Sequence, residues 1–452
     1  MTRWSRISPF YRHCRSVNFN LQIKHNVIGS STSRAFCRLW LLVSLSLLST
    51  VHGQSLAAPL LLGELLHAAA GTYPTILAAR LEARASGQDV LATERIRWPT
   101  LSTTLETNTG SPNVSASRAV QLEQPIWDFG RSKALIAESQ TLSDISQIKV
   151  QLVQQDVYLL VVMAWQNLIA SNERVRFAKL TRSRLVDYQA QIRRRVEAEA
   201  SPRIDLELAD ARLLQTEVEL LTGQTSLQVA IQRLEQLSGV QLLAQRVPNA
   251  TYPLSKQETQ AFLNELDQTD LQQVALVHPV TGKARMDVLA LRRSLDAKNS
   301  EAYPQVYARV VKPIGAGSAS NDLATTYFLG MRYTPGPGFS NLIQAQAIGT
   351  RIDGAEQSID TAIREMQQTL QTDREEFVNA RNRIEALEKS VSSSAVVLDS
   401  YQRQFQAGRK QWQDLLNQVR ELAQNQYALA DAQASMVGAQ ARLQIRMGQI
   451  PK

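Results

Sequence analysis

The feature that most constrains this chain is a stretch of 70 residues, 131–200, that contains neither proline nor glycine. It is rich in Gln, Leu, Ala, Arg and Ser, and its apolar side chains recur at spacings of three, four or seven, as in coiled coils. A continuous helix of this length would extend about 105 Å. Because helices in compact domains rarely exceed about 25 residues, the stretch predicts a long helical arm.

The second half of the chain repeats this plan. A second arm is expected after Pro335 and Pro337, and breaks at 200–202 and 407–408 are each followed by a return helix. Landmark residues recur at equal spacings in the two halves: Pro74 to Pro99 and Pro279 to Pro304 are both 25 residues, Val196 to Asp205 and Phe405 to Asp414 are both nine, and Asp205 to Gly239 and Asp414 to Gly448 are both 34. We therefore predict a tandem duplication.

The predicted organisation has four parts. Residues 1–53 form a signal peptide, 54–240 the first repeat, 241–277 a connector, and 278–452 the second repeat. The connector contains Pro248, Pro253 and a short amphipathic segment, Lys256–Leu266. We expect it to pack against the middle of the helical arms.

Each repeat begins with a helix that ends before a proline, because proline cannot continue a helix and favours an extended residue before it. The helices are expected at Leu62–Arg97 and Arg285–Ala302. Alternating segments then predict two strands in each repeat. The four strands are expected at Thr100–Thr107, Ser117–Gln124, Gln305–Lys312 and Thr325–Thr334.

The last strand shows the alternation most clearly. Its apolar positions share one face, which we expect to contact lipid: Tyr327, Leu329, Met331 and Tyr333. Strands of about eight to ten residues have the length that a tilted membrane strand needs. Four strands cannot close a barrel alone, since about eight are required, and open edges cannot lie in lipid. Several copies sharing one barrel would resolve this, and these features leave the number of copies open.

The N-terminal segment has the properties of a secretory signal. Residues 1–52 hold seven basic residues and no acidic one, and the apolar run Leu39–Leu48 is too short to span a bilayer. Val51 and Gly53 place cleavage near Gly53, with Ala58 as a second position. A buried N-terminal helix is the alternative. The rest of the chain has 42 basic and 41 acidic residues, a balance that argues against a nucleic-acid partner.

The sequence after the predicted signal peptide lacks the motifs of common catalytic, phosphate-binding and metal sites. Both cysteines lie within residues 1–53, and only His67 and His278 remain of the five histidines. There is no phosphate-binding Gly-x-x-x-x-Gly-Lys-Ser/Thr motif, no Gly-x-Ser-x-Gly motif and no pair of histidines at metal-ligand spacing. We expect no enzymatic activity, no cofactor and no metal. His278 precedes Pro279 as Tyr73 precedes Pro74, which favours a role in packing a turn.

Six short motifs follow one another along the chain: Tyr73-Pro, Leu77-Ala-Ala-Arg80, Trp98-Pro-Thr-Leu-Ser102, Gln124-Pro-Ile-Trp-Asp-Phe-Gly-Arg131, Phe405-Gln-Ala-Gly408 and Asp414-Leu-Leu-Asn417. In this order, and within a duplicated chain, these motifs resemble the TolC family of outer-membrane export channels. The resemblance covers essentially all of the chain after the signal. It implies a mainly α protein with a transmembrane β part, in which three copies form a 12-stranded barrel in the outer membrane and long helical hairpins extend through the periplasm.

The resemblance also implies partners. Such a homotrimer would dock with a periplasmic adaptor and an inner-membrane ABC or proton-driven transporter. Segments 193–205 and 401–412 most resemble members that serve type I secretion of large adhesins. The alternatives are a duct for small-molecule or drug efflux, a periplasmic coiled-coil adaptor, and a filamentous scaffold. The sequence identifies neither the cargo nor the transporter.

Finally, the resemblance implies a gate at the turns of the hairpins. The family's aperture carboxylate falls on Asp414 and its partner position on Asn417, with Lys410, Phe405 and Asp205 nearby. Asn417 is not acidic and Phe405 lacks a hydroxyl, so an ion pair between Asp205 and Lys410 is the expected latch. Three copies of Asp414 would favour cations. The alternative is that Asp205 and Asp414 only stabilise the first turns of their helices.

Overall fold

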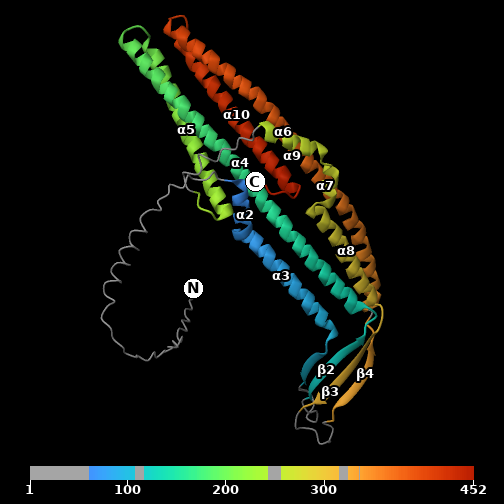
Figure 1. The fold of residues 1–452 in the computed structure, drawn as a ribbon. Helices are drawn as coiled ribbons and strands as arrows, with labels where there is room; N and C mark the ends of the chain where they lie inside the picture. Colours follow the sequence, from blue (N-terminus) through green and yellow to red (C-terminus); the bar gives the residue numbers. More distant parts are fainter. Residues whose placement is uncertain (1–60, 107–116, 243–255, 315–323, 335, 452) are drawn as a thin grey trace, which may run out of the picture. The chain divides into compact units, whose positions relative to one another are not determined.

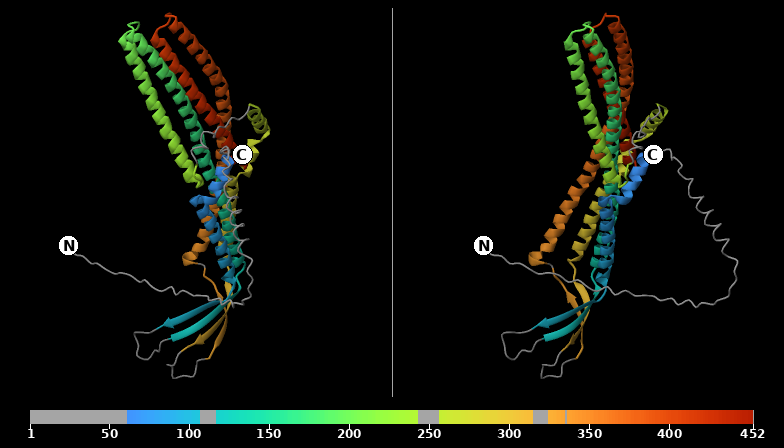
Figure 2. Two further views of the ribbon diagram at one scale, coloured as in Figure 1. Left: turned by 60° about the vertical axis from the view of Figure 1, so that its left-hand side comes forward. Right: turned by 90° about the vertical axis from the view of Figure 1, so that its left-hand side faces the viewer.

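Two antiparallel helical hairpins and one four-stranded sheet make up most of the protein (Figure 1). The computed structural model describes residues 61–106, 117–242, 256–314, 324–334 and 336–451. All of these residues belong to one compact unit. In this unit the sheet lies at one end and the turns of the hairpins lie at the other (Figure 2). The predicted signal peptide lies outside the described residues.

The two arms are single helices of equal length. Helix α4 (Arg131–Glu197) and helix α9 (Ser340–Gln406) each have 67 residues. The return helices, α5 (Arg203–Ser238) and α10 (Trp412–Arg446), have 36 and 35. Both predicted breaks are confirmed. The equal lengths bring the two turns to the same end of the unit, as a duplicated sequence requires.

The predicted helix Leu62–Arg97 is wrong in one respect, because it is divided. The structure has α2 (Leu62–Thr72), α3 (Pro74–Glu94) and a 3₁₀ turn, η1 (Arg95–Arg97). Pro74 restricts the residue before it to extended geometry, and Tyr73 has φ −70° and ψ 124°. In the second repeat α8 (Pro279–Ser300) begins six residues before the expected Arg285, because Pro279 is well suited to the first position of a helix.

A tight turn connects the sheet to each arm. Before α4, the carboxylate of Asp128 accepts hydrogen bonds from the backbone N–H groups of Ser132, at 2.8 Å, and Gly130, at 3.2 Å. Gly130 has φ +90°, a conformation that only glycine adopts without strain. Phe129 and Phe339 both have φ near +50–60° and precede α4 and α9. In both repeats a phenylalanine and a glycine with positive φ precede the arm, but their order differs, with Gly338 before Phe339 in the second repeat.

Both repeats contribute to one antiparallel sheet of order β1-β2-β3-β4. Its strands are β1 (Thr100–Glu106), β2 (Ser117–Trp127), β3 (Gln305–Pro313) and β4 (Thr326–Arg332). All four predicted strands are present. Strand β2 is three residues longer than expected, because a register shift between Pro125 and Trp127 carries the pairing past the proline.

The connector packs where predicted. Helices α6 (Lys256–Gln268) and α7 (Leu271–Val277) bury apolar side chains against α9 and α10. The rings of Phe262 and Phe377 meet edge to face, with centroids 5.2 Å apart. The buried carboxylate of Asp373 on α9 binds Arg442 and Arg446 on α10 at 3.0 and 2.8 Å. Apolar packing and these two ion pairs together hold the second hairpin and the connector in place. The bounds of the four predicted parts of the chain stay a prediction.

His278 joins the connector to the first arm. It is buried at the N-terminus of α8, where its Nδ1 lies 3.3 Å from the backbone nitrogen of Val280 and its Nε2 lies 3.0 Å from the amide nitrogen of Gln155 on α4. A protonated ring would lose the acceptor that faces Val280. Burial, and then the charge of Arg446, lower the pKa of His278 to about 4.

This shift predicts a pH-dependent stability. The unfolded chain, with a histidine pKa of about 6.5, binds the proton that the folded chain excludes. The contribution is therefore complete above pH 6.5 and is lost as the pH falls to 4, by roughly 3 kcal/mol at most. His278→Asn, which keeps a side-chain acceptor at the helix start, should flatten the pH dependence of the thermal midpoint over this range. His67→Asn, at an exposed site, should not, and equal flattening in both variants would contradict the assignment.

Candidate functional site

The sheet has one apolar face, which is exposed. The strand registers place the following side chains on it: Leu101, Leu105, Val120, Leu122, Val306, Ala308, Val310, Tyr327, Leu329 and Met331. Leu329 is 79% exposed and Tyr327 76%. Tyr333 follows β4 and is also exposed. A continuous exposed apolar surface of this kind in a soluble monomer is unusual and marks a surface that contacts lipid or protein.

Aromatic side chains border this face at the end of the sheet nearest the helices. Trp98, Trp127 and Tyr303 are exposed beside the strand ends. Phe129 stacks on Tyr303 at 5.4 Å and meets Trp127 edge to face at 6.0 Å. Exposed Trp and Tyr next to an apolar band are typical of a membrane–water interface. At the other end of the same face the register places Arg118 and Lys312.

The two outer strands each pair on one side only. In the described chain β1 pairs with β2 and β4 pairs with β3, so the backbone groups on the outer sides of β1 and β4 have no strand partner. None of the described helices is long and apolar enough to cross a membrane.

The structure places the predicted gate residues near the two hairpin turns, and within the described chain Lys410 pairs with Asp414; the latch between Asp205 and Lys410 stays a prediction. The Nζ of Lys410 lies 3.1 Å from Oδ2 of Asp414 and 4.4 Å from the ring centre of Tyr401. The four-residue spacing at the start of α10 brings this pair together, whereas Asp205 lies in the first turn of α5, on the other hairpin. The hydrogen bond that Lys410 donates to the carboxylate of Asp414 raises the pKa of Lys410.

The remaining gate positions differ in exposure. Phe405 is 5% exposed and packs against Trp412, with ring centroids 5.2 Å apart. The guanidinium of Arg195 lies 4.4 Å from the centre of the Phe405 ring. Asn417 is exposed and Asp205 is half-buried. Packing contacts with Trp412 and Arg195 therefore hold the Phe405 ring, which lacks the hydroxyl expected at this position.

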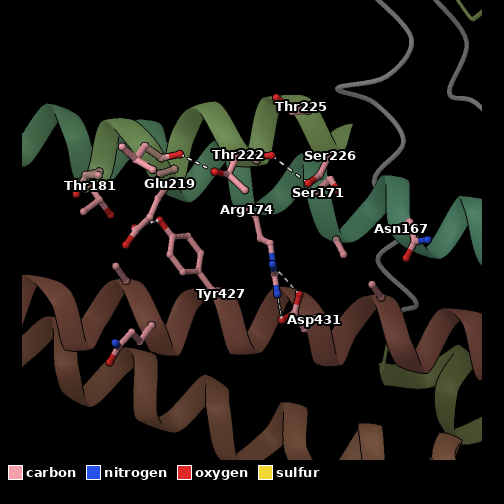
Figure 3. A pocket seen from close by; sticks show the side chains of 18 of the residues that line it. Asn167, Ser171, Arg174, Thr181, Glu219, Thr222, Thr225, Ser226, Tyr427 and Asp431 are labelled. Atoms are coloured by element: carbon pink, nitrogen blue, oxygen red, sulfur yellow. Dashed lines mark hydrogen bonds and ion pairs between the residues drawn. The ribbon is translucent and has the colours of Figure 1, made fainter. Parts of the chain in front are cut away.

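Polar contacts connect the first hairpin to the second. Arg174 on α4 forms a bidentate pair with Asp431 on α10, with 2.8 Å between Nε and Oδ1 (Figure 3). Nearer the turns, the hydroxyl of Tyr188 on α4 donates to Oε1 of Gln402 on α9 at 3.1 Å. We call these contacts, Arg174–Asp431 and Tyr188–Gln402, the inter-hairpin links.

A cavity of about 1060 Å³ surrounds Arg174 and Asp431, lined by α4, α5 and α10. Tyr427 on α10 points into it toward Glu219 on α5, and the hydroxyl lies 3.4 Å from Oε2 of the carboxylate (Figure 3). Burial, and then the neighbouring carboxylate, raise the pKa of Tyr427 to about 12. The tyrosine therefore stays a neutral hydrogen-bond donor. Two polar contacts, Arg174–Asp431 and Tyr427–Glu219, cross this cavity.

Sequence reasoning missed these links. One signal was available for Asp431, which is the single charged residue in the alanine-rich run Tyr427–Ala434. A carboxylate in such a run on a packed helix needs a partner, but nothing in the sequence shows that the partner is Arg174, 257 residues away.

The comparison with protein families gives one match. Residues 65–240 match the family model described as outer membrane efflux protein. This segment begins within α2 and includes α3, β1, β2 and the first hairpin. No curated protein matches the chain.

Solved structures match over most of the chain. CusC, studied for transmembrane channel formation, is 15% identical, with 87% of this chain and 93% of that chain covered and a TM-score of 0.73. The outer membrane protein VceC of Vibrio cholerae is 14% identical, with 86% and 97% covered and a TM-score of 0.69. The MtrE outer membrane channel of Neisseria gonorrhoeae is 15% identical, with 86% and 89% covered and a TM-score of 0.70.

At these identities the solved structures show a common fold, and the family model adds a sequence relationship. The fold is mainly α with four strands, and its matches are outer-membrane channels. These findings show that residues 65–240 are similar to the outer membrane efflux protein family and that the chain shares the fold of solved outer-membrane channels.

Proposed function

We propose that three copies of this chain form a channel for export across the periplasm and the outer membrane. The observation that carries the proposal is the sheet, with its exposed apolar face and its two unpaired edges. Pairing β4 of one copy with β1 of the next satisfies both edges, as lipid requires. Three copies of a four-stranded sheet give a 12-stranded barrel, too wide for side chains to fill.

The helices give the proposed channel its periplasmic part. In the trimer the hairpins of three copies would surround a water-filled space continuous with the barrel. A periplasmic adaptor and an inner-membrane ABC or proton-driven transporter would complete the export path. We infer no enzymatic role for the chain.

Type I secretion of large adhesins is the cargo class we favour. It is supported by segments 193–205 and 401–412, which span the two hairpin turns and resemble members with that role. The second candidate is small-molecule efflux, which the description of the matching family model favours. An adaptor or scaffold would need neither two matched hairpins nor a sheet with an apolar outer face.

The direct test of the proposal is assembly and conductance. The mature chain, extracted in detergent, should run as a heat-modifiable trimer in gel electrophoresis and open ion-conducting pores in a planar bilayer. Recovery as a soluble monomer from a periplasmic extract would contradict the proposal.

The face of the sheet that contacts lipid can be tested in β4. Leu329→Arg should lower trimer yield strongly, because an arginine in the middle of the membrane costs about 2–4 kcal/mol. Phe328→Arg, one residue earlier and on the opposite face, should be much milder. Trimer yield in outer-membrane fractions measures the difference, and equal loss in both variants would mean that the strand faces are assigned wrongly.

The gate can be tested through selectivity. If Asp414 lines the closed end, Asp414→Asn should lower the permeability ratio of cations to anions, because three carboxylates leave the aperture. Lys410→Gln should raise that ratio, because Asp414 loses its countercharge. Reversal potentials in a salt gradient measure both. Unchanged selectivity in both variants would leave Asp414 only the role of a helix-terminal residue.

The inter-hairpin links predict how the channel is held closed. Arg174→Gln removes the pair with Asp431, and a half-exposed ion pair contributes about 0.2–1 kcal/mol. Over three copies the ratio of open to closed channels should rise about threefold or more. Single-channel open probability is the measurement.

Arg182→Gln is the matched control for this prediction. Arg182 lies on the same helix and binds Glu217 on α5 at 3.1 Å, within one hairpin. Its loss should leave the open probability unchanged. The same rise in both variants would show a general effect on helix stability rather than a link between hairpins.

A further inference from the structure

The face of the sheet opposite the apolar one carries a compact charged cluster around Glu123 on β2. Its carboxylate Oε2 lies 3.0 Å from Nη2 of Arg309 on β3, and Oε1 lies 3.1 Å from Nη1 of Arg332 on β4. Gln121 also donates to Oε2, at 3.3 Å. Two guanidinium groups thus share one carboxylate, and the cluster has an excess of one positive charge.

Tyr307 holds both arginines in place. The guanidinium carbons of Arg309 and Arg332 lie 4.8 and 4.7 Å from the centre of its ring, within the range of cation–π contacts. The ring itself lies against Gly330, where an added Cβ would come within 2.7 Å of the ring carbon Cζ and of the hydroxyl. Only glycine therefore allows the ring position in which Tyr307 contacts both arginines.

The strand register places the cluster near the helical end of the sheet. Glu123 is opposite Thr100 and Arg309, and Arg332 is opposite Gln305, the first residue of β3. The other described positions of β1 and β2 on this face are uncharged, namely Ser102, Thr104, Ala119 and Gln121. The excess positive charge is therefore local to this level of the sheet.

This inference rests on the trimer proposed above, in which the polar face lines the lumen. We infer that Arg309 and Arg332 of the three copies form a cationic ring inside the barrel that attracts anions, above all carboxylate and phosphate groups. Rings of arginine or lysine are the usual device of anion-selective pores, and a planar guanidinium binds carboxylates and phosphates through two parallel hydrogen bonds. The barrel would then favour anionic groups on the cargo, opposite to the acidic aperture at Asp414.

A series of charge variants tests the ring. Arg309→Gln neutralises the excess charge, and the double variant Arg309→Gln with Arg332→Gln reverses it. The permeability ratio of K⁺ to Cl⁻ should rise in the first and rise further in the second. For three unit charges about 10 Å from the axis in 0.1 M KCl, each of these two substitutions should raise the permeability ratio about fourfold. Glu123→Gln should shift the ratio in the opposite direction.

Two further variants serve as controls. Lys312→Gln removes the same charge from the same strand, but on the apolar face, and should leave the reversal potential unchanged. Arg309→Lys keeps the charge and should retain the wild-type ratio if the variant assembles. Tripolyphosphate added on the barrel side should block the wild-type channel and the Asp414→Asn variant, but not the double arginine variant.

The outcomes separate the two proposals. If the wild-type chain forms no conducting trimer, the channel itself is contradicted. If conducting trimers form and the arginine variants shift neither the reversal potential nor the block, the channel stands and the cationic ring is wrong. An equal shift from Lys312→Gln would also overturn the ring, because charge on the outer face would then have the same effect.

Discussion

The need to satisfy every backbone hydrogen bond in lipid is the constraint on which the rest of this structure depends. A sheet of four strands leaves the outer sides of β1 and β4 unpaired, which no single chain can place in a membrane. Closure by further copies solves this and also sets the width of the helical part, because the helices follow directly from the strands. The tight turns at Asp128–Gly130 and before α9 matter for the same reason, since they fix the direction in which each 67-residue arm leaves the sheet.

The Arg174–Asp431 ion pair between the hairpins is more exposed than the ion pairs within the second hairpin. Within the second hairpin, a buried carboxylate bound by two arginines and a packed pair of phenylalanines hold α9, α10 and the connector together. Between the hairpins, toward the turns, Arg174–Asp431 crosses a cavity and is partly exposed to solvent. Exposed ion pairs contribute little, whereas buried charged networks are costly to break. The ion pair is therefore a weak part of the contact between the hairpins, which toward the turns also share a buried apolar cluster that includes Tyr188, Ile192 and Trp412.

The sequence was sufficient for the parts of the fold that depend on local rules. Pro99 and Pro304 marked the helix ends, the alternation in Tyr327–Tyr333 marked a strand, and equal spacings marked the duplication. The division at Tyr73 could have been predicted from Pro74, which was treated as a landmark instead of a helix start. The links between hairpins could not, because Arg174 and Asp431 are distant in sequence and their pairing depends on how two hairpins pack. For Lys410, a partner four residues away was available in the sequence, but the family resemblance directed attention to Asp205.

The charges along the proposed conduit have a consequence for transport. At the periplasmic end Asp414 keeps its carboxylate partly exposed although Lys410 binds it, and at the barrel end two arginines share one carboxylate at Glu123. In the proposed trimer, the partly exposed carboxylates of Asp414 and the excess positive charge around Glu123 would create a potential that changes sign along the axis. A small ion of either sign meets one favourable and one unfavourable region, and this limits its passage. A long extended polypeptide carries charges of both signs, and its acidic groups can occupy the basic ring while its basic groups are still at the aperture. In the proposed trimer this arrangement would suit a cargo long enough to contact both ends at once, which is consistent with the proposal of protein export.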